Sequence, residues 1–137
     1  MASWAVSHTN RFKAAVSGAG VYDMFNDLGT EIASYVPGDE WNYGPFFDDQ
    51  NREALHKDSP ATYVKNVRTP ILLLHGELAP VDTVGQTYAF YRALKHYGAT
   101  TQLVVYPREG HSLREEKHQI DRLNRTVDWY DQFLKHP

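Results

Sequence analysis

Two polar runs in this sequence could carry catalytic chemistry, and each follows directly on a short apolar segment. The first is residues 75–82, and the second is residues 106–112, in which His111 follows Gly110. Catalytic groups of open α/β sheets lie outside the carboxyl ends of the strands. If the apolar segments are strands, His111 lies at that edge of the sheet, where an imidazole could act as a general base.

A metal site is a second interpretation of the same region. His111, Glu115 and His118 lie three, four and seven residues apart on a predicted helix, a pattern that could place ligand atoms together. We favour the simpler interpretation that Glu115 caps a solvated helix start. The sequence therefore predicts neither a metal nor a cofactor.

Composition restricts the class of protein. The chain has 137 residues, 42% of them hydrophobic, a net charge of −3 and no cysteine. It should form one domain or a piece of one. Interleaved charges offer no basic face for nucleic acid, and apolar runs such as residues 71–74 are far shorter than the ~20 residues that span a membrane. Residues 1–10 lack a signal-peptide pattern, which favours a cytoplasmic location.

Three apolar runs, residues 12–17, 70–75 and 101–106, are expected to be strands. The second and third are apolar without alternation, which is typical of strands covered on both faces in a parallel sheet. Each of these two precedes a helix signal. The alternation of strand and helix predicts an α/β fold, with a mainly parallel sheet and flanking helices.

The helix signals are capping boxes, a helix stop and an apolar stripe. Thr83 with Gln86, and Ser112 with Glu115, fit the capping-box spacing, and Gly98 stands where the first helix should end. Apolar residues beyond Ser112 recur on one helical face, which should pack against another element. The residues of this stripe are Ile120, Leu123, Val127, Tyr130 and Leu134.

Residues 21–58 interrupt the strand and helix pattern with an aromatic-rich excursion. A segment of this length inside a compact domain tends to form a lid or a pocket wall, here with a short helix around residues 24–34. Its aromatic side chains could bind substrate or simply cover the sheet. They are Trp41, Tyr43, Phe46 and Phe47. Ser59-Pro60 should then begin a turn of helix.

Three segments, in order, resemble the C-terminal half of the catalytic domain of the prolyl oligopeptidase family. They are residues 11–20, residues 59–77, which end in His75-Gly76-Glu77, and residues 106–111, which end in Gly110-His111. The chain is most similar to the acylaminoacyl-peptidase and dipeptidyl-peptidase branch. The resemblance implies a partial α/β-hydrolase fold over residues 1–137, a peptide or acyl-peptide substrate cleaved through an acyl-enzyme, and His111 as the triad histidine.

The resemblance also predicts that the nucleophilic serine is missing. In the family it lies in a Gly-x-Ser-x-Gly-Gly elbow, and the start Met1-Ala2-Ser3-Trp4 is similar to the segment just after that elbow. The N-terminal half of the domain is therefore expected to be absent, and the chain to be inactive alone.

The family's triad acid follows His-Gly-Glu-x, a position that Ala79 occupies here, thirty-two residues before His111. Asp82 and Glu77 are the nearest carboxylates that could substitute. A shift of a few residues is expected to carry the carboxylate beyond the ~3 Å reach of a hydrogen bond.

Two alternatives remain open. The chain could be an interaction module that completes a separate N-terminal half or self-associates, since the strand at residues 12–17 would lack a neighbour. It could also be a small esterase, because Ser17, Asp82 and His111 follow the order nucleophile, acid, base. Ala15 at the first glycine position of an elbow weighs against that esterase.

Overall fold

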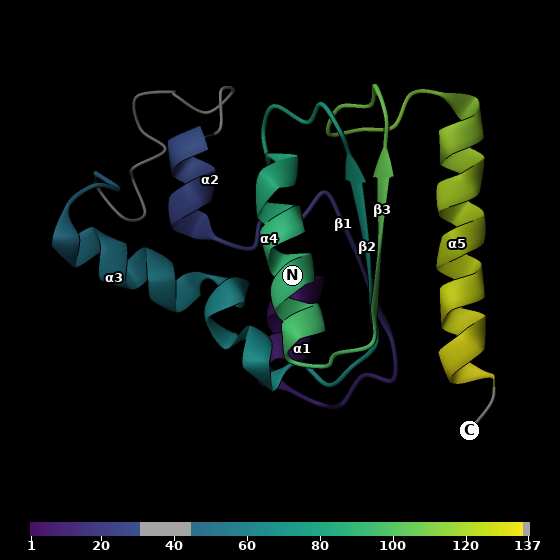
Figure 1. The fold of residues 1–137 in the computed structure, drawn as a ribbon, viewed down its shortest axis with the longest axis horizontal. Coiled ribbons are helices and arrows are strands. Elements are labelled where there is room, and N and C mark those ends of the chain that lie inside the picture. The colour runs from purple at the N-terminus through teal and green to yellow at the C-terminus, as the bar shows by residue number, and fades with distance from the viewer. Residues whose placement is uncertain (31–44, 136–137) are drawn as a thin grey trace.

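A three-stranded parallel sheet forms the centre of the molecule, with the strands in the order β1-β2-β3 (Figure 1). The strands are β1 (Ala15–Gly18), β2 (Ile71–Gly76) and β3 (Thr101–Tyr106). The structure is a computed structural model that describes residues 1–30 and 45–135. The predicted α/β class and the parallel sheet are confirmed.

β1 begins three residues later than the sequence predicts. Its pairing starts where the Ala15 N–H donates to the Pro70 carbonyl oxygen, at 2.9 Å. The next ladder bond toward the N-terminus would need an N–H at position 70, which proline lacks. Phe12, inside the predicted strand, is 50% exposed.

β2 is the central strand, and all six of its residues are buried. Because side chains alternate across a strand, Ile71 and Leu73 join one apolar cluster, while Leu72 and Leu74 join another on the opposite face. The absence of alternation in the sequence therefore indicated correctly that both faces of this strand are covered.

Helices cover both faces of the sheet (Figure 1). Helix α4 (Val84–His96) packs with α1 (Ala2–His8) and the 3₁₀ helix η2 (Pro60–Asn66) on one side, and α5 (Glu116–Leu134) lies on the other. The predicted helical turn after Ser59 is η2. No helix within residues 1–30 and 45–135 is both long and apolar enough to cross a membrane.

The helix stop was predicted correctly, but both capping boxes were wrong. Gly98 has a φ of +75° just beyond α4, the left-handed conformation that glycine adopts without steric strain. Thr83 precedes α4 without a side-chain cap, since the Gln86 amide instead bonds the Tyr22 N–H and the Asp27 carboxylate. Gln86, which the spacing assigned to a helix cap, therefore makes tertiary hydrogen bonds instead.

The apolar stripe of α5 does not pack within the part of the chain that the structure describes. Ile120, Leu123, Val127 and Leu134 are each about half exposed or more. Trp129 is instead buried against the cluster that contains Leu72 and Leu74, with Phe133 beside it. The helix is rotated so that its largest apolar side chain covers the sheet.

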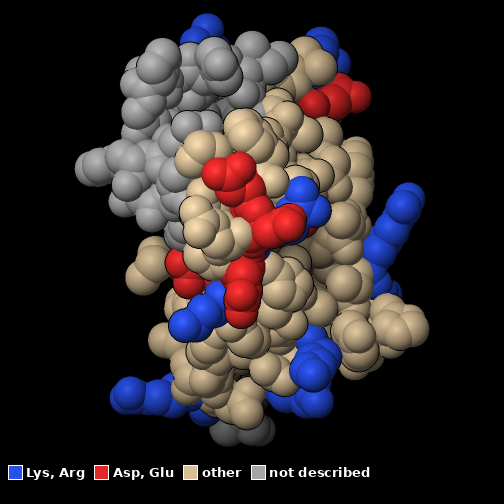
Figure 2. Space-filling view, turned by 90° about the vertical axis from the view of Figure 1, so that its left-hand side faces the viewer, with Lys and Arg blue, Asp and Glu red and all other residues tan. Residues whose placement is uncertain are grey.

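The structure describes two helices in residues 21–30 and 45–58 of the aromatic excursion, of which the sequence predicted one. Helix α2 (Met24–Thr30) begins as expected, and residues 31–34 of that prediction lie outside the described residues. Helix α3 (Asp49–Asp58) was not predicted. Arg52 of α3 lies over the ring of Phe25 in α2, at 4.7 Å from its centroid, which joins the two helices. Acidic side chains gather on this face of the molecule (Figure 2).

We expect Trp129→Ala to lower the free energy of unfolding by about 3–5 kcal/mol, because it leaves a cavity beside Leu72 and Leu74. Leu123→Ala, at a position 63% exposed on the same helix, should change it by less than about 0.5 kcal/mol. Urea denaturation followed by circular dichroism measures both. Equal losses would show that α5 is anchored through its stripe.

Candidate functional site

Two loops meet at the carboxyl ends of the strands and form the candidate site. One joins β2 to α4, and the other joins β3 to α5. The Leu78 N–H donates to the Glu109 carbonyl oxygen at 2.8 Å, and the Arg108 N–H donates to the Glu77 carboxylate at 3.1 Å. These bonds hold the loops in a fixed relative position.

Gly76 permits this close approach of the two loops. A side-chain carbon at position 76 would overlap the backbone oxygen of Gly110 and come within 2.7 Å of the Glu109 carbonyl oxygen. Both atoms belong to the backbone and cannot rotate away. The glycine of the His75-Gly76 pair is therefore required for packing at the base of the site.

His111 and Asp82 are joined by a short hydrogen bond between these loops. His111 Nδ1 lies 2.6 Å from Asp82 Oδ1, and the side chains are 53% and 2% exposed, respectively. Because a carboxylate can only accept, Nδ1 carries the proton and Nε2 of the neutral ring is left as the basic atom. The pair has the orientation expected of a general base and the acid that aligns it.

The three positions considered for the acid have different surroundings. Asp82 meets His111, although the sequence argument placed it out of reach. Ala79 is 6% exposed, and its N–H donates a hydrogen bond to the Gly76 carbonyl oxygen at 3.2 Å. The Glu77 carboxylate accepts a hydrogen bond from the Arg108 N–H. The turn at Ala79 lets the loop bring a residue three positions later to the histidine.

His75, at the end of β2, lies behind this pair and is fully buried. Its Nε2 donates to the Asp82 carbonyl oxygen at 2.7 Å and lies 3.9 Å from Asp82 Oδ2. Burial lowers the pKa of His75 below its ordinary value of 6.5, despite the hydrogen bond to Asp82. Among the residues that the structure describes, Asp82 Oδ2 accepts no hydrogen bond.

A hollow of about 420 Å³ opens beside His111 at the ends of the strands. Its lining includes Gly18 and Ala19 from the end of β1, Gly76, and Tyr106. Ala19 has a φ of +44°, which is unusual for a residue with a side chain and is often found near functional sites. A substrate carbonyl could reach the imidazole through this hollow.

Ser17 is engaged elsewhere. Its hydroxyl lies 3.1 Å from the Tyr22 hydroxyl, and the residue is 6% exposed in the middle of the β1 pairing. The sequence correctly places it on a strand. This environment differs from the exposed turn that a nucleophile elbow requires.

The aromatic candidates are only partly described. Trp41 and Tyr43 lie outside the described residues. Phe46 packs edge-on against Phe25 of α2, with 5.6 Å between ring centroids, and Phe47 is 62% exposed beside it. A role for these side chains in substrate binding stays a prediction.

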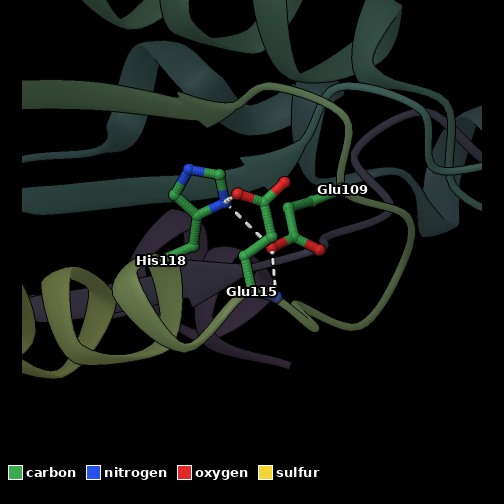
Figure 3. A group of neighbouring side chains, drawn as sticks. All are labelled: Glu109, Glu115 and His118. Carbon is green, nitrogen blue, oxygen red and sulfur yellow. Dashed lines mark hydrogen bonds and ion pairs between the residues drawn. The ribbon is translucent and has the colours of Figure 1, made fainter.

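Glu109, Glu115 and His118 bring their ligand atoms within 4.8 Å of one another at the start of α5 (Figure 3). Each already has an internal role. Glu109 accepts hydrogen bonds from the Arg114 and Glu115 N–H groups at 2.8 Å and from His118 Nδ1 at 2.9 Å, while Glu115 pairs with Arg108. The predicted cap by Ser112 and Glu115 was wrong, because α5 begins after Glu115 without a side-chain cap, and Glu109 binds the N–H groups of the two residues just before the helix.

The sequence analysis did not single out Glu109. Burial alone would raise its pKa, but the hydrogen bonds from Arg114, Glu115 and His118 outweigh burial and lower the pKa below 4.5. Its function is to fix the loop that carries His111 onto α5. The sequence holds no local signal for this contact, because the acid lies outside the first turn of the helix.

Comparisons with known proteins find relatives of this chain among peptidases. The sequence profile described as Prolyl oligopeptidase family matches residues 1–137. An uncharacterized peptidase of Bacillus subtilis, YuxL, is 36% identical over 137 residues, covering 98% of this chain and 20% of that protein. Dipeptidyl-peptidase 5 of Porphyromonas gingivalis is 28% identical, over 93% of this chain and 19% of that protein.

Solved peptidase structures share the fold. Uncomplexed acylaminoacyl peptidase of Pyrococcus horikoshii superposes with a TM-score of 0.83 at 23% identity, covering 97% of this chain and 22% of that one. An acylaminoacyl peptidase in complex with Z-Gly-Gly-Phe-chloromethyl ketone gives a TM-score of 0.83 at 25% identity, over the same fractions. The chain thus spans about a fifth of these relatives.

We expect Glu109→Gln to destabilise the fold at neutral pH. Because the folded-state pKa of Glu109 is lowered, the ionised carboxylate stabilises the fold above its unfolded-state pKa of 4.5, and this contribution is lost as the pH falls through the folded-state pKa. The difference in unfolding free energy between the two proteins should therefore narrow below pH 4.5.

Thermal and urea denaturation from pH 7 to pH 3 measures this difference. Glu116→Gln removes the same charge from an exposed position in the first turn of α5 and is the matched control. A pH-independent effect of Glu109→Gln would show that its carboxylate does not stabilise the fold as an ionised hydrogen-bond acceptor.

Proposed function

The chain belongs to the prolyl oligopeptidase family, and from this premise we propose that it supplies the histidine and the acid of a serine-peptidase active site. The reaction is attack of a serine on a peptide or acyl-amide carbonyl, formation of an acyl-enzyme, and hydrolysis. His111 Nε2 takes the proton of the serine and then gives it to the leaving amine. The observation that carries the proposal is the 2.6 Å bond between His111 Nδ1 and Asp82.

Asp82 is the acid in this proposal. Its bond to Nδ1 fixes the tautomer that leaves Nε2 free to accept a proton, and its charge stabilises the imidazolium that then forms. Neither rival carboxylate position is supported, since Ala79 has no titratable group and Glu77 is bound to the Arg108 N–H.

The nucleophilic serine lies outside these residues in this proposal, in a segment that pairs with the chain. Two surface features support that pairing. Within the described residues β1 has a neighbour on one side only, and α5 exposes the stripe that contains Leu123 and Val127. An unpaired strand edge and an exposed apolar helix face are both suited to receiving further structure, or to self-association when it is missing.

Peptides or acyl-peptides are the proposed substrates. The support is the similarity to a dipeptidyl-peptidase and to an acylaminoacyl peptidase solved with a peptide chloromethyl ketone. The hollow of about 420 Å³ beside His111 is open to such a chain end. Phe46 and Phe47 remain proposed contacts for the side chains of the substrate.

We expect the 137-residue chain alone to resist labelling by a fluorophosphonate probe and to leave aminoacyl arylamides uncleaved. A chimera that joins a family member's Gly-x-Ser-x-Gly-Gly segment in frame to residue 1 should label, and His111→Ala should abolish labelling because the serine loses its base. Labelling of the isolated chain that disappears with Ser17→Ala would favour the small esterase instead.

The identity of the acid can be tested in the same chimera. Asp82→Asn should lower kcat by about 10⁴-fold, since an amide cannot hold the required tautomer or stabilise the imidazolium. Glu77→Gln is the matched control and should retain most of the rate. Steady-state kinetics that show a greater loss with Glu77→Gln would place the acid at Glu77, and restoration of Asp82→Asn by Ala79→Asp would show that position 79 can still serve.

A further inference from the structure

A buried chain of polar side chains runs through the core behind the site, and His75 is its last member before Asp82. Thr87 Oγ1, from α4, lies 2.7 Å from His75 Nδ1, and His75 Nε2 lies 2.7 Å from the Asp82 carbonyl oxygen. Thr87 is fully buried and His75 is 2% exposed. Both ring nitrogens therefore have partners within the protein.

The hydrogen-bond partners of His75 determine which of its ring nitrogens carries the proton. The Asp82 carbonyl can only accept, so His75 Nε2 carries a proton and donates. Burial lowers the pKa of His75, so the ring is neutral and its Nδ1 accepts from the Thr87 hydroxyl. His75 is thereby restricted to one tautomer.

A separate hydrogen bond joins two other buried side chains, Ser17 and Tyr22. The Tyr22 hydroxyl lies 3.1 Å from the Ser17 hydroxyl, and both residues are buried. Burial raises the pKa of Tyr22 to about 12, which keeps the phenol neutral. Thr87 and His75 donate in one direction, toward the Asp82 carbonyl oxygen.

We propose that His75 is a positioning residue for the Asp82–His111 pair: its Nε2–H fixes the main-chain carbonyl of Asp82, so that the carboxylate of that residue meets His111 Nδ1. The catalytic consequence rests on the proposed function, whereas the positioning itself concerns this chain alone. The carbonyl and the carboxylate of one residue are only a few bonds apart, so anchoring the first restricts the second. This anchor explains how an acid three positions beyond Ala79 reaches the histidine.

The test is the tautomer of His111 in the 137-residue chain, measured by long-range ¹H–¹⁵N NMR of the histidine rings at about pH 8, where an ordinary histidine is neutral. The wild-type chain should show His111 with its proton on Nδ1 and His75 with its proton on Nε2. His75→Leu keeps the apolar volume and removes the anchor, so His111 should lose its single Nδ1–H tautomer. His75→Gln retains a donor of similar reach and should preserve it.

A second pair of variants covers the case in which His75→Leu does not fold. Thr87→Val removes the donor to His75 Nδ1 at nearly constant volume, and both rings should shift toward mixed tautomers. Thr87→Ser keeps the hydroxyl and should retain the wild-type pattern. A residue of merely structural importance would lower the unfolding free energy without changing the tautomer of His111.

The inference is overturned if folded His75→Leu keeps the Nδ1–H tautomer of His111, or if Thr87→Val leaves both rings unchanged. In the catalytic chimera, His75→Leu should lower kcat with little change in KM. A chimera that hydrolyses no substrate, while the tautomers respond as expected, contradicts the proposed function and leaves the positioning role intact. An active chimera in which the tautomers do not respond to the substitutions contradicts the positioning role of His75 and supports the proposed function.

Discussion

A carboxylate withdrawn from water is the constraint on which the candidate site depends. Asp82 is 2% exposed, and a buried charge without partners strongly destabilises a fold. His111 supplies one donor to this carboxylate, from a loop that follows a different strand. The bond therefore survives only while the two loops hold their relative position, and the contacts at Gly76, Glu77 and Glu109 all serve that end.

The apolar core and the polar chain behind Asp82 depend on one another. Tyr22 stacks on Phe90 with 4.5 Å between ring centroids, and both belong to the cluster that covers one face of β2. Packing thus fixes the phenol whose hydroxyl lies 3.1 Å from the Ser17 hydroxyl. In return, hydrogen bonds satisfy the polar atoms that this packing buries, which a low-dielectric core requires.

The proposed function needs a nucleophile from a further segment, and two exposed surface features could receive such a segment. The chain spans about a fifth of its relatives, 20% of YuxL and 22% of an acylaminoacyl peptidase. Within the described residues, β1 has a neighbour on one side only, and most of the stripe on α5 is exposed. A further segment could extend the sheet at the first of these features or cover the helix at the second. The histidine and acid are positioned by internal contacts that do not need that segment.

The sequence alone determined the features that depend on local pattern. Unbroken apolar runs predicted β2 and β3, Gly98 marked the end of α4, and the run after β3 placed His111 at the carboxyl ends of the strands, because each rests on neighbouring residues. Only the tertiary structure decided the contacts between distant segments. These are Asp82 rather than Ala79 or Glu77 beside His111, the bond of Glu109 to His118 in α5, and Trp129 rather than the stripe against the sheet. Loop geometry and helix rotation are set by the packing of the whole chain, which residue spacing cannot specify.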